Sequence, residues 1–362
     1  MKKICILSTV NIKHMTLVSL YTEYMDNNKI PYDIIYIDKY NSEEATSAKK
    51  IYKYNLKINK NWTFMRKLFN YWGFKKYAKE ILLSEKYDFI IVWNSFTAFM
   101  FADILTNKFK NKYCINIRDY AKESLFPVFI RMKKVISQSS FTTISSEGFK
   151  NFLPKYDYLT VHSMNLKVLQ NCIPRTSLRK IDEPIRITYI GYISFVENCY
   201  KMIDALGNDK RFILQFYGEG SDELMVYARE REIENVICHG RFEPSETSGF
   251  IQNSDVIYNL YGVGNLHVDT ALSIKLYYAI YMNLPIIVFK GTYMEEVSSK
   301  CGIGFAIGKD DFVNLGNNFY DWYHRLDHRE IVKKSQLFKD EITNSHKKLE
   351  HTINKYIGHM EY

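Results

Sequence analysis

Strand-like runs rich in β-branched and aromatic residues alternate with helix-compatible segments along most of the chain, and this alternation limits the possible folds more than any other feature. In the first half these runs occupy residues 3–9, 32–38, 87–93, 112–119, 141–146 and 158–164. In the second half they occupy residues 185–191, 211–220, 235–242, 254–262, 284–291 and 302–307. Strands joined through helices by short links predict parallel sheets with helices on both faces.

A less regular basic stretch, residues 165–186, lies between the two sets and carries Pro174 and Pro184. Irregular stretches with proline are typical of interdomain linkers. The chain of 362 residues is therefore predicted to be an α/β protein with two doubly wound, Rossmann-like domains facing a central cleft. We place these domains at residues 1–168 and 185–335, followed by a helical tail at 336–362. In such folds ligands bind at the carboxyl ends of the strands.

The cysteines and the N-terminus bear on the cellular compartment. Six cysteines are scattered through the chain without a C-x-x-C pair, which indicates free thiols in a reducing cytoplasm. The first seven residues fit a first strand better than a signal peptide. No apolar run approaches the roughly 18 residues that a membrane span needs. The sequence thus predicts a cytoplasmic protein.

The net charge of +9 is concentrated in one segment. Residues 49–79 contain ten Lys or Arg, nine aromatic residues and no Asp or Glu. A basic, aromatic, helix-compatible segment of this kind is a candidate for lying on an anionic membrane surface, here the inner face of the cell membrane, or for holding a phosphorylated lipid. The alternative is a solvated helix whose aromatic residues face the core. Nucleic acid is not expected as a partner, because the rest of the chain is nearly balanced in charge and contains no recognised binding module.

Six short motifs follow one another in the second half, and their order is more informative than any one of them. They are ITYIG, FYGEGSDEL, IENVICHGRF, NSDVIYNLY, SIKLYYAIYMNLPIIV and GIGFAI. Together they cover roughly residues 185–308 and resemble the C-terminal domain of GT-B fold glycosyltransferases of the family 4 type, found in capsule and lipopolysaccharide assembly. The first half resembles these proteins only in its α/β architecture.

The resemblance implies an enzyme that moves a sugar from a nucleotide-sugar donor to a saccharide acceptor, with retention of anomeric configuration. It implies a role in capsule or surface polysaccharide biosynthesis, with an acceptor that is linked to a lipid. The N-terminal domain is then expected to bind the acceptor and the C-terminal domain the donor.

The sequence departs from the family pattern at three positions. The Glu that usually holds the nucleotide ribose, seven residues before the helix-ending Pro285, is replaced by Tyr278. The usual glycine two residues before that proline is Asn283, and the first Glu of the Glu-x7-Glu pair is Thr270. These departures affect the expected donor contacts and stereochemistry more than the expected fold.

Sugar transfer from a nucleotide donor leaves a diphosphate with growing negative charge, which cations and helix N-terminal N–H groups stabilise. Lys275, near the start of a predicted helix with Ser273 as its N-cap, is our candidate for a catalytic contact with this diphosphate. The alternative is a surface lysine whose stem lies along the helix. No acidic metal motif such as D-x-D stands in a suitable place, so we expect a metal-independent reaction that needs no cofactor.

The other expected donor-binding residues follow predicted strands of the second domain or stand at the departures from the family pattern. Arg241 could instead form a loop salt bridge, and the polar run at 259–269 could be an ordinary surface turn. The full set is Gly191, Lys201, Gly218, Gly220, Arg241, Asn265, His267, Asp269, Ser273 and Tyr278.

Candidate acceptor-side residues follow two strands of the first domain. Asp119 ends a predicted strand, where a carboxylate can accept or orient the proton of an acceptor hydroxyl. The alternative is a structural Arg–Asp pair that caps the next helix. Arg118, Glu123 and His14 are the expected acceptor-binding residues, although His14 also suits a capping role.

Two other functions fit the same sequence. A sugar-nucleotide 2-epimerase shares the two-domain architecture but has less use for the basic aromatic segment. A non-catalytic partner in polysaccharide assembly is consistent with the replacement of the ribose-binding Glu by Tyr278. A dehydrogenase is disfavoured, because no G-x-G-x-x-G opens a strand–helix unit in either half.

Overall fold

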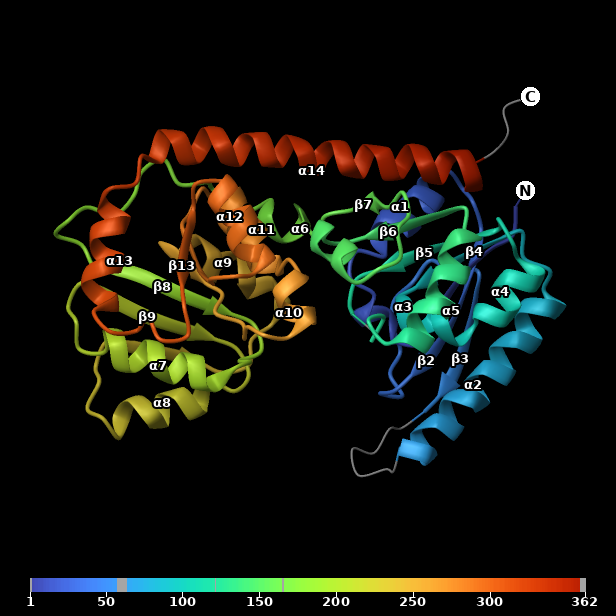
Figure 1. Ribbon diagram of the computed structural model, residues 1–362, viewed down its shortest axis with the longest axis horizontal. Helices are drawn as coiled ribbons and strands as arrows, with labels where there is room; N and C mark the ends of the chain where they lie inside the picture. The colour runs from blue at the N-terminus through green and yellow to red at the C-terminus, as the bar shows by residue number, and fades with distance from the viewer. Residues whose placement is uncertain (1, 57–63, 121, 165, 359–362) are drawn as a thin grey trace. The chain divides into compact units, whose positions relative to one another are not determined.

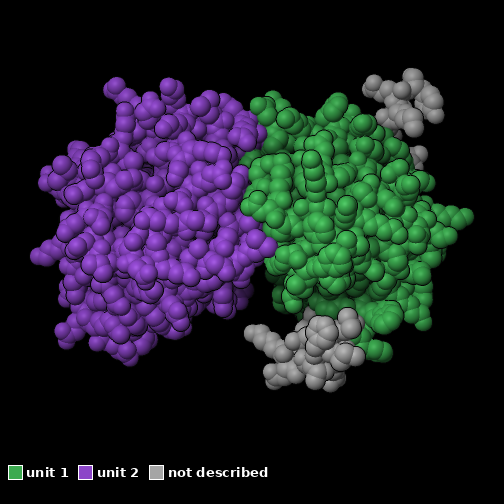
Figure 2. All heavy atoms as spheres, viewed as in Figure 1, with its two compact units in different colours: residues 1–162, 344–362 green, residues 163–343 purple. Residues whose placement is uncertain are grey.

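The computed structural model describes residues 2–56, 64–120, 122–164 and 166–358. The chain divides into two compact units, one formed by Met1–His162 with Asn344–Tyr362 and the other by Ser163–Thr343 (Figure 1, Figure 2). Each unit is built on a parallel sheet with α-helices, which confirms the predicted class of two Rossmann-like α/β domains. The units divide at 162 and 343, whereas the sequence analysis placed the domain limits at 168, 185 and 335.

In its described residues the first unit has a seven-stranded sheet with the order β3-β2-β1-β4-β5-β6-β7, and the pairings are parallel. The strands are β1 (Ile4–Ser8), β2 (Tyr32–Asp38), β3 (Lys50–Asn55), β4 (Phe89–Trp93), β5 (Tyr113–Ile117), β6 (Phe141–Ile144) and β7 (Leu159–Thr160). All residues of β1, β2, β4, β5 and β6 are buried. Continuous apolar runs are expected of parallel strands that are covered on both faces.

The helices of the first unit are α1 (Ser19–Asn27), α2 (Phe64–Ser84), α3 (Ser95–Met100), α4 (Ala102–Lys108) and α5 (Phe126–Ser137), with short 3-10 helices η1 (Ile12–His14) and η2 (Glu147–Asn151). Tyr21 and Met25 of α1 pack in one buried cluster with Ile4, Ile6 and Trp93 of the sheet. Ile4 and Ile6 belong to the same cluster because alternate residues of a strand face the same side of a sheet.

Residues 50–55 differ from the sequence-based expectation. They lie in the segment that was interpreted as helix-compatible, but they form β3, which pairs with β2 along its whole length. Ile51, Tyr52 and Tyr54 favour a strand because β-branched and aromatic side chains fit a half-buried pleated surface. β3 is an edge strand, and its first residue, Lys50, is exposed; charged side chains are usual on edge strands, because they oppose further pairing.

In its described residues the second unit has a six-stranded parallel sheet with the order β10-β9-β8-β11-β12-β13. Its strands are β8 (Ile185–Ile190), β9 (Phe212–Tyr217), β10 (Val236–His239), β11 (Val256–Tyr258), β12 (Ile286–Phe289) and β13 (Gly304–Ile307). Its helices are α6 (Leu166–Leu169), α7 (Val196–Leu206), α8 (Ser221–Arg229), α9 (Thr247–Gln252), α10 (Leu266–Thr270), α11 (Ile274–Met282), α12 (Tyr293–Lys300) and α13 (Leu315–His324), with the 3-10 helix η3 (Pro244–Glu246).

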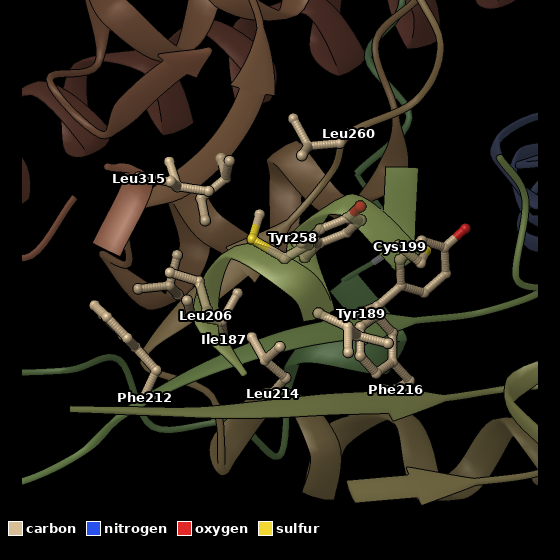
Figure 3. Packing of buried hydrophobic residues seen from close by; sticks show 14 of the residues in the cluster. Ile187, Tyr189, Cys199, Leu206, Phe212, Leu214, Phe216, Tyr258, Leu260 and Leu315 are labelled. Atoms are coloured by element: carbon tan, nitrogen blue, oxygen red, sulfur yellow. The ribbon is translucent and has the colours of Figure 1, made fainter. Parts of the chain in front are cut away.

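Alternate residues of the second sheet enter two different cores. Ile287 and Phe289 of β12 pack with α7 and α13, whereas Ile286 and Val288 pack with α11 and α12. Figure 3 shows part of the first of these cores, where Tyr189 lies among other buried side chains of the sheet and of α7. The period-two pattern of each strand therefore explains why helices cover both faces of this sheet.

The long helix α14 (His328–Ile357) contributes to the cores of both units. Ile331 and Ile342 belong to a buried cluster of the second unit, and Leu349, Ile353 and Ile357 belong to the buried cluster of the first unit. The predicted helical tail is thus helical, but its last part packs on the first sheet. Among the described residues no helix combines the length and the hydrophobicity that are required to cross a bilayer.

The strand order of the second unit defines where a ligand site is expected. β8 begins this unit's strand series and lies between β9 and β11, so the chain reverses its direction across the sheet next to β8. Ligands of doubly wound folds bind at the carboxyl ends of the strands beside this switch point. A ligand site is therefore expected among the residues that follow β8 and β11.

Candidate functional site

Lys275 lies in the first turn of α11 and is only 2% exposed. Ser273 is the N-cap of this helix, and its Oγ accepts a hydrogen bond from the backbone N–H of Lys275 at 3.3 Å. The structure therefore confirms the predicted helix start and its cap. A lysine is rarely buried to this extent without specific partners, so the surface-lysine alternative is wrong.

The ammonium group of Lys275 is held by two tyrosines. Its Nζ donates a hydrogen bond to Tyr261 Oη at 2.6 Å, and it lies 4.6 Å from the centroid of that ring. The same Nζ lies 4.3 Å from the ring centroid of Tyr189, the penultimate residue of β8. Cation–π contacts of this length are favourable, and more so when water is excluded.

Lys275 also lies beside the glycine turn that follows β8. A β-carbon built on Gly191 would be 4.0 Å from Lys275 Nζ, so the ammonium group is close to the backbone at this turn. Tyr261 follows β11, the other strand beside the switch point. The structure thus brings Gly191, Tyr261 and Lys275 together at the carboxyl ends of β8 and β11.

The charge of Lys275 changes the acidity of its neighbour. Burial alone would raise the pKa of Tyr261, but the positive charge of Lys275 and hydrogen bonds with Lys275, Tyr189 and Ser273 hold this pKa below its ordinary value. The phenol oxygen of Tyr261 therefore accepts negative charge more readily than an isolated tyrosine does. Lys275 and Tyr261 form a polar pair inside an otherwise aromatic environment.

The predicted glycines have a clear steric purpose. Gly191, Gly218 and Gly220 all have positive φ, at 117°, 147° and 96°, a region that favours glycine. A β-carbon on Gly218 would lie 1.9 Å from the carbonyl oxygen of Gly191. The turns after β8 and β9 therefore touch through their backbones, and any side chain at Gly218 would force them apart.

Phe195, at the end of the loop after β8, packs beside Tyr261 and Gly262. Phe195 has φ of 56°, and its ring would be 2.7 Å from a β-carbon on Gly262. The Phe195 ring centroid is 5.7 Å from that of Tyr261. Tyr192 of the same loop is 68% exposed. The partner of Lys275 is therefore itself covered by an aromatic side chain.

Asn265, His267 and Asp269 lie in one polar turn after β11. The side chain of Asn265 caps α10 by accepting a hydrogen bond from the His267 N–H at 3.0 Å. The Gly264 N–H donates one hydrogen bond that is shared between the two carboxylate oxygens of Asp269. A β-carbon on Gly264 would be 3.8 Å from Lys309 Nζ, a cation that the sequence analysis did not select. Local capping thus accounts for part of this run, and its polar side chains stay candidates for sugar contacts.

One buried polar atom in this region has no protein partner. Asn259 follows β11 and is 2% exposed, and among the described residues nothing donates a hydrogen bond to its Oδ1. Buried polar atoms are almost always paired. An unpaired acceptor at the carboxyl end of a strand beside the switch point is what a polar ligand group would satisfy.

Tyr278 and Asn283 show how the departures from the family pattern are accommodated. Tyr278 is 6% exposed and belongs to the core that α11 forms with β12, and burial raises its pKa to about 12. Asn283 takes the left-handed conformation that ends α11, with φ of 57°. Asparagine tolerates this conformation better than other non-glycine residues, which explains why it can replace the usual glycine.

Lys201 and Arg241 are not among the residues that the structure brings to Lys275. Lys201 Nζ donates to the Lys309 carbonyl oxygen at 3.5 Å and lies 5.5 Å from the Phe312 ring centroid. Arg241 is exposed and follows β10, the edge strand two positions from β8. Arg241 could therefore contact only the part of a donor that extends from β8 toward the edge of the sheet.

The candidate acceptor residues all belong to the first unit. Asp119 is exposed and follows β5, as predicted, whereas Glu123 is fully buried. Arg118 Nη1 donates to the Val161 carbonyl oxygen at 3.0 Å. His14 lies in η1 with its Nε2 3.0 Å from Tyr40 Oη. Of these four candidates, Asp119 and His14 have exposed side chains, whereas Arg118 is half-buried and Glu123 is buried.

Two contacts of Lys275, with Tyr189 and with Tyr261, could not be expected from the motif match alone. Tyr189 lies inside an apolar strand, and nothing in its sequence context marks it as a cation partner. Tyr261 belongs to the polar run after β11, but its contact with Lys275 depends on how that run folds back on α11.

No group of three or more His, Cys, Asp or Glu side chains suited to a metal ion occurs among the described residues.

No protein-family model and no curated protein sequence matches the chain. Solved structures do match it over nearly its full length. A sucrose-phosphate synthase from Thermosynechococcus elongatus is 12% identical with a TM-score of 0.68, covering 98% of this chain and 99% of the synthase. HepE of Anabaena in complex with UDP is 10% identical with a TM-score of 0.67, covering 98% of this chain and 100% of HepE.

The lipopolysaccharide outer core galactosyltransferase WaaB is similar as well, with 16% identity, a TM-score of 0.63, and coverage of 98% of this chain and 99% of WaaB. Identities this low show the fold and leave the substrates open. The two parallel sheets, their Rossmann-like strand orders and these matches together show that the chain has the GT-B fold.

Proposed function

We propose that the protein is a glycosyltransferase that takes a nucleotide sugar as donor. The observation that carries this proposal is the buried Lys275, which lies at the switch point of the second sheet, beside a glycine turn and in the first turn of α11. Negative charge is favoured at such a position, because the ammonium group and the free N–H groups of a helix N-terminus act together. HepE, which is similar in fold, binds UDP and UDP-glucose.

Lys275 acts on the leaving diphosphate in this proposal. Its ammonium group neutralises charge that grows as the glycosidic bond to the donor breaks, and its buried position makes this interaction stronger than in water. Tyr261 holds Nζ in place before the donor arrives. The contacting turns at Gly191 and Gly218 let backbone groups approach the phosphates without a side chain between them.

The acceptor is proposed to bind on the first unit, where Asp119 follows β5. A carboxylate there can orient an acceptor hydroxyl and accept its proton. We propose an acceptor saccharide linked to a lipid, in capsule or surface polysaccharide biosynthesis, with retention of configuration. Charge neutralisation by Lys275 assigns no role to a metal, so transfer is expected to continue in EDTA.

Contact with the membrane is part of the same proposal. A lipid-linked acceptor requires the enzyme to work at a bilayer, and the basic aromatic segment 49–79 supports such contact. Residues 57–63 of this segment lie outside the described residues. The rest of the segment, residues 49–56 and 64–79, carries seven of its lysines: Lys49, Lys50, Lys53, Lys67, Lys75, Lys76 and Lys79.

A binding screen followed by a transfer assay tests the proposal. UDP and several nucleotide sugars should raise the midpoint of thermal unfolding, and at equal concentration the ligands that bind more tightly should raise it further. The best donor should then be consumed faster when membrane extract supplies an acceptor. Consumption without any acceptor, giving an isomeric nucleotide sugar, would identify an epimerase instead. No stabilisation by any nucleotide would favour a non-catalytic role.

A further inference from the structure

Side chains of helices α2, α3 and α5 of the first unit line an open groove of about 240 Å³. The side chains that line it are mostly aromatic, and two cationic side chains join them. They include Tyr71, Trp72, Phe96, Phe99, Lys75 and Arg131. The rings of Tyr71 and Phe96 meet edge to face with centroids 5.2 Å apart. The groove is thus a formed and mostly apolar surface. It is contributed by three separate helices, which are labelled in Figure 1.

Large apolar side chains on the same three helices are exposed to an unusual degree. Trp72 is 69% exposed and Phe69, one turn before it on α2, is 78% exposed. Phe126 and Ile130, one turn apart on α5, are 76% and 49% exposed, and Phe96 of the groove is 38% exposed. Several large exposed apolar side chains on the helices that line one groove are typical of an interaction site.

Basic side chains accompany this apolar surface. Arg131, Lys133 and Lys134 lie on α5, a helix without any Asp or Glu. In the groove, Lys75 pairs with Asp103 at 2.8 Å, and Arg131 lies 3.6 Å from the same carboxylate oxygen. One carboxylate therefore faces two cations, and the surface keeps a net positive charge.

The lysines of β3 contribute less to this surface than the sequence suggested. Lys50 Nζ donates to Glu85 at 2.9 Å, and Lys53 Nζ donates to the Ser42 carbonyl oxygen at 3.4 Å. These side chains have partners within the unit. The combination of exposed aromatic residues and cations therefore lies on α2, α3 and α5 and extends beyond residues 49–79.

We propose that this groove takes up an acyl chain of an anionic phospholipid at a bilayer surface, while the lysines of α5 contact neighbouring head groups. The inference rests on the proposed function only in assuming that the enzyme acts at a bilayer. Trp and Phe together with Lys and Arg are the side chains that favour an anionic lipid interface. A protein partner is less suitable, because lysine is depleted at protein–protein interfaces.

Vesicle co-sedimentation of the full chain tests this proposal. Wild-type protein should bind vesicles of phosphatidylglycerol and phosphatidylcholine, and should bind pure phosphatidylcholine vesicles far less. Trp72→Ser with Phe96→Ser, two exposed side chains that line the groove, should weaken binding to the anionic vesicles about tenfold or more, because two apolar groups no longer enter the interface. Lys133→Gln with Lys134→Gln should weaken it about tenfold or more, and this difference should shrink at high salt.

Matched substitutions on α14 serve as controls. Leu337→Ser removes an exposed apolar side chain, 64% exposed, from a helix surface outside the groove. Lys347→Gln with Lys348→Gln removes two adjacent exposed lysines from the same helix. Neither control should change vesicle binding by more than about twofold, since single exposed side chains away from a binding surface have small effects.

The outcomes separate this inference from the proposed function. Absence of wild-type binding to anionic vesicles, or equal loss in the groove and control variants, would overturn it. So would binding that requires an added polyprenyl phosphate, or a change of oligomeric state in the groove variants without a change in vesicle binding. Nucleotide-induced thermal stabilisation, measured on the same variants, should be unaltered; its absence in the wild type would instead count against the proposed function.

Discussion

The ammonium group of Lys275 donates a hydrogen bond of 2.6 Å to the phenol oxygen of Tyr261, and both residues lie at the carboxyl ends of the strands beside the switch point. A buried cation needs a compensating group, and here the compensation comes from a neutral phenol and two ring faces. This arrangement keeps the positive charge available to a ligand. A carboxylate partner would have cancelled it.

Tyr261→Phe should lower kcat about 10- to 100-fold and change KM for the donor much less. The variant keeps the ring but removes the oxygen that fixes Lys275 Nζ, so the charge is displaced from the position that the transition state requires. Steady-state kinetics with varied donor concentration measure both constants. Tyr258→Phe is the control, because it removes the hydroxyl of a nearby tyrosine that is 1% exposed and belongs to the core around α7; equal effects in both variants would contradict the assigned role of Tyr261.

Gly218→Ala should destabilise the second unit by several kcal/mol and abolish nucleotide binding. Its new β-carbon would lie 1.9 Å from the Gly191 carbonyl oxygen at a φ of 147°, so the two turns must separate. Thermal unfolding with and without UDP gives both quantities. Gly249→Ala is the control, since a β-carbon there meets no atom within 4 Å and alanine favours a helix by up to about 1 kcal/mol. A stable Gly218→Ala variant that binds UDP normally would refute the proposed contact between these turns.

Asp119→Asn should reduce transfer to the acceptor about 100-fold, a typical effect for loss of a general base. It should leave UDP binding and thermal stability unchanged, because Asp119 is exposed and belongs to the first unit. Asp157→Asn removes another exposed carboxylate of the same unit as a control. A full transfer rate in the Asp119 variant would exclude this residue from catalysis.

The free energy of unfolding should fall as the pH is lowered from 6.5 to about 4, because of His162. Burial, the nearby His346 and Arg118 lower the pKa of His162 to about 4 against the opposing effect of Glu147. The unfolded chain therefore binds a proton in this window that the folded chain does not, and unfolding becomes easier by at most about 1.4 kcal/mol per pH unit. His162→Gln should flatten this slope in denaturant titrations from pH 7 to 4. An unchanged slope would show that other groups dominate acid sensitivity.

The sheet-forming segments could be predicted because their signals are local. Most strands are short β-branched or aromatic runs between turns, and Ser273 marks the start of α11 by its ability to cap. β3 escaped prediction because its lysine-rich sequence follows the pattern of a basic helix as well as that of an edge strand. The division of α14 between two cores also escaped, since an amphipathic helix does not show which sheet it will cover.

The candidate site was predictable where a motif fixes a backbone position and not where it depends on folding at a distance. Gly191, Gly218 and Lys275 follow from turns and a helix start. The contacts that give Lys275 its environment join residues far apart in the chain, such as Tyr189 and Lys275. The burial of Glu123 could not be predicted either, because the residues around it in the sequence do not show which side faces the core.

The central claim is that the buried charge of Lys275 binds the donor diphosphate. Lys275→Met keeps most of the side-chain volume and removes the charge, so isothermal titration with UDP measures how much this charge contributes to UDP affinity. Lys210→Met is the control, because Lys210 is an exposed lysine just before β9. We predict an unchanged fold, UDP affinity about 10-fold or more weaker, and transfer about 100- to 1,000-fold slower. Normal UDP affinity and normal transfer in a correctly folded Lys275→Met protein would contradict the account.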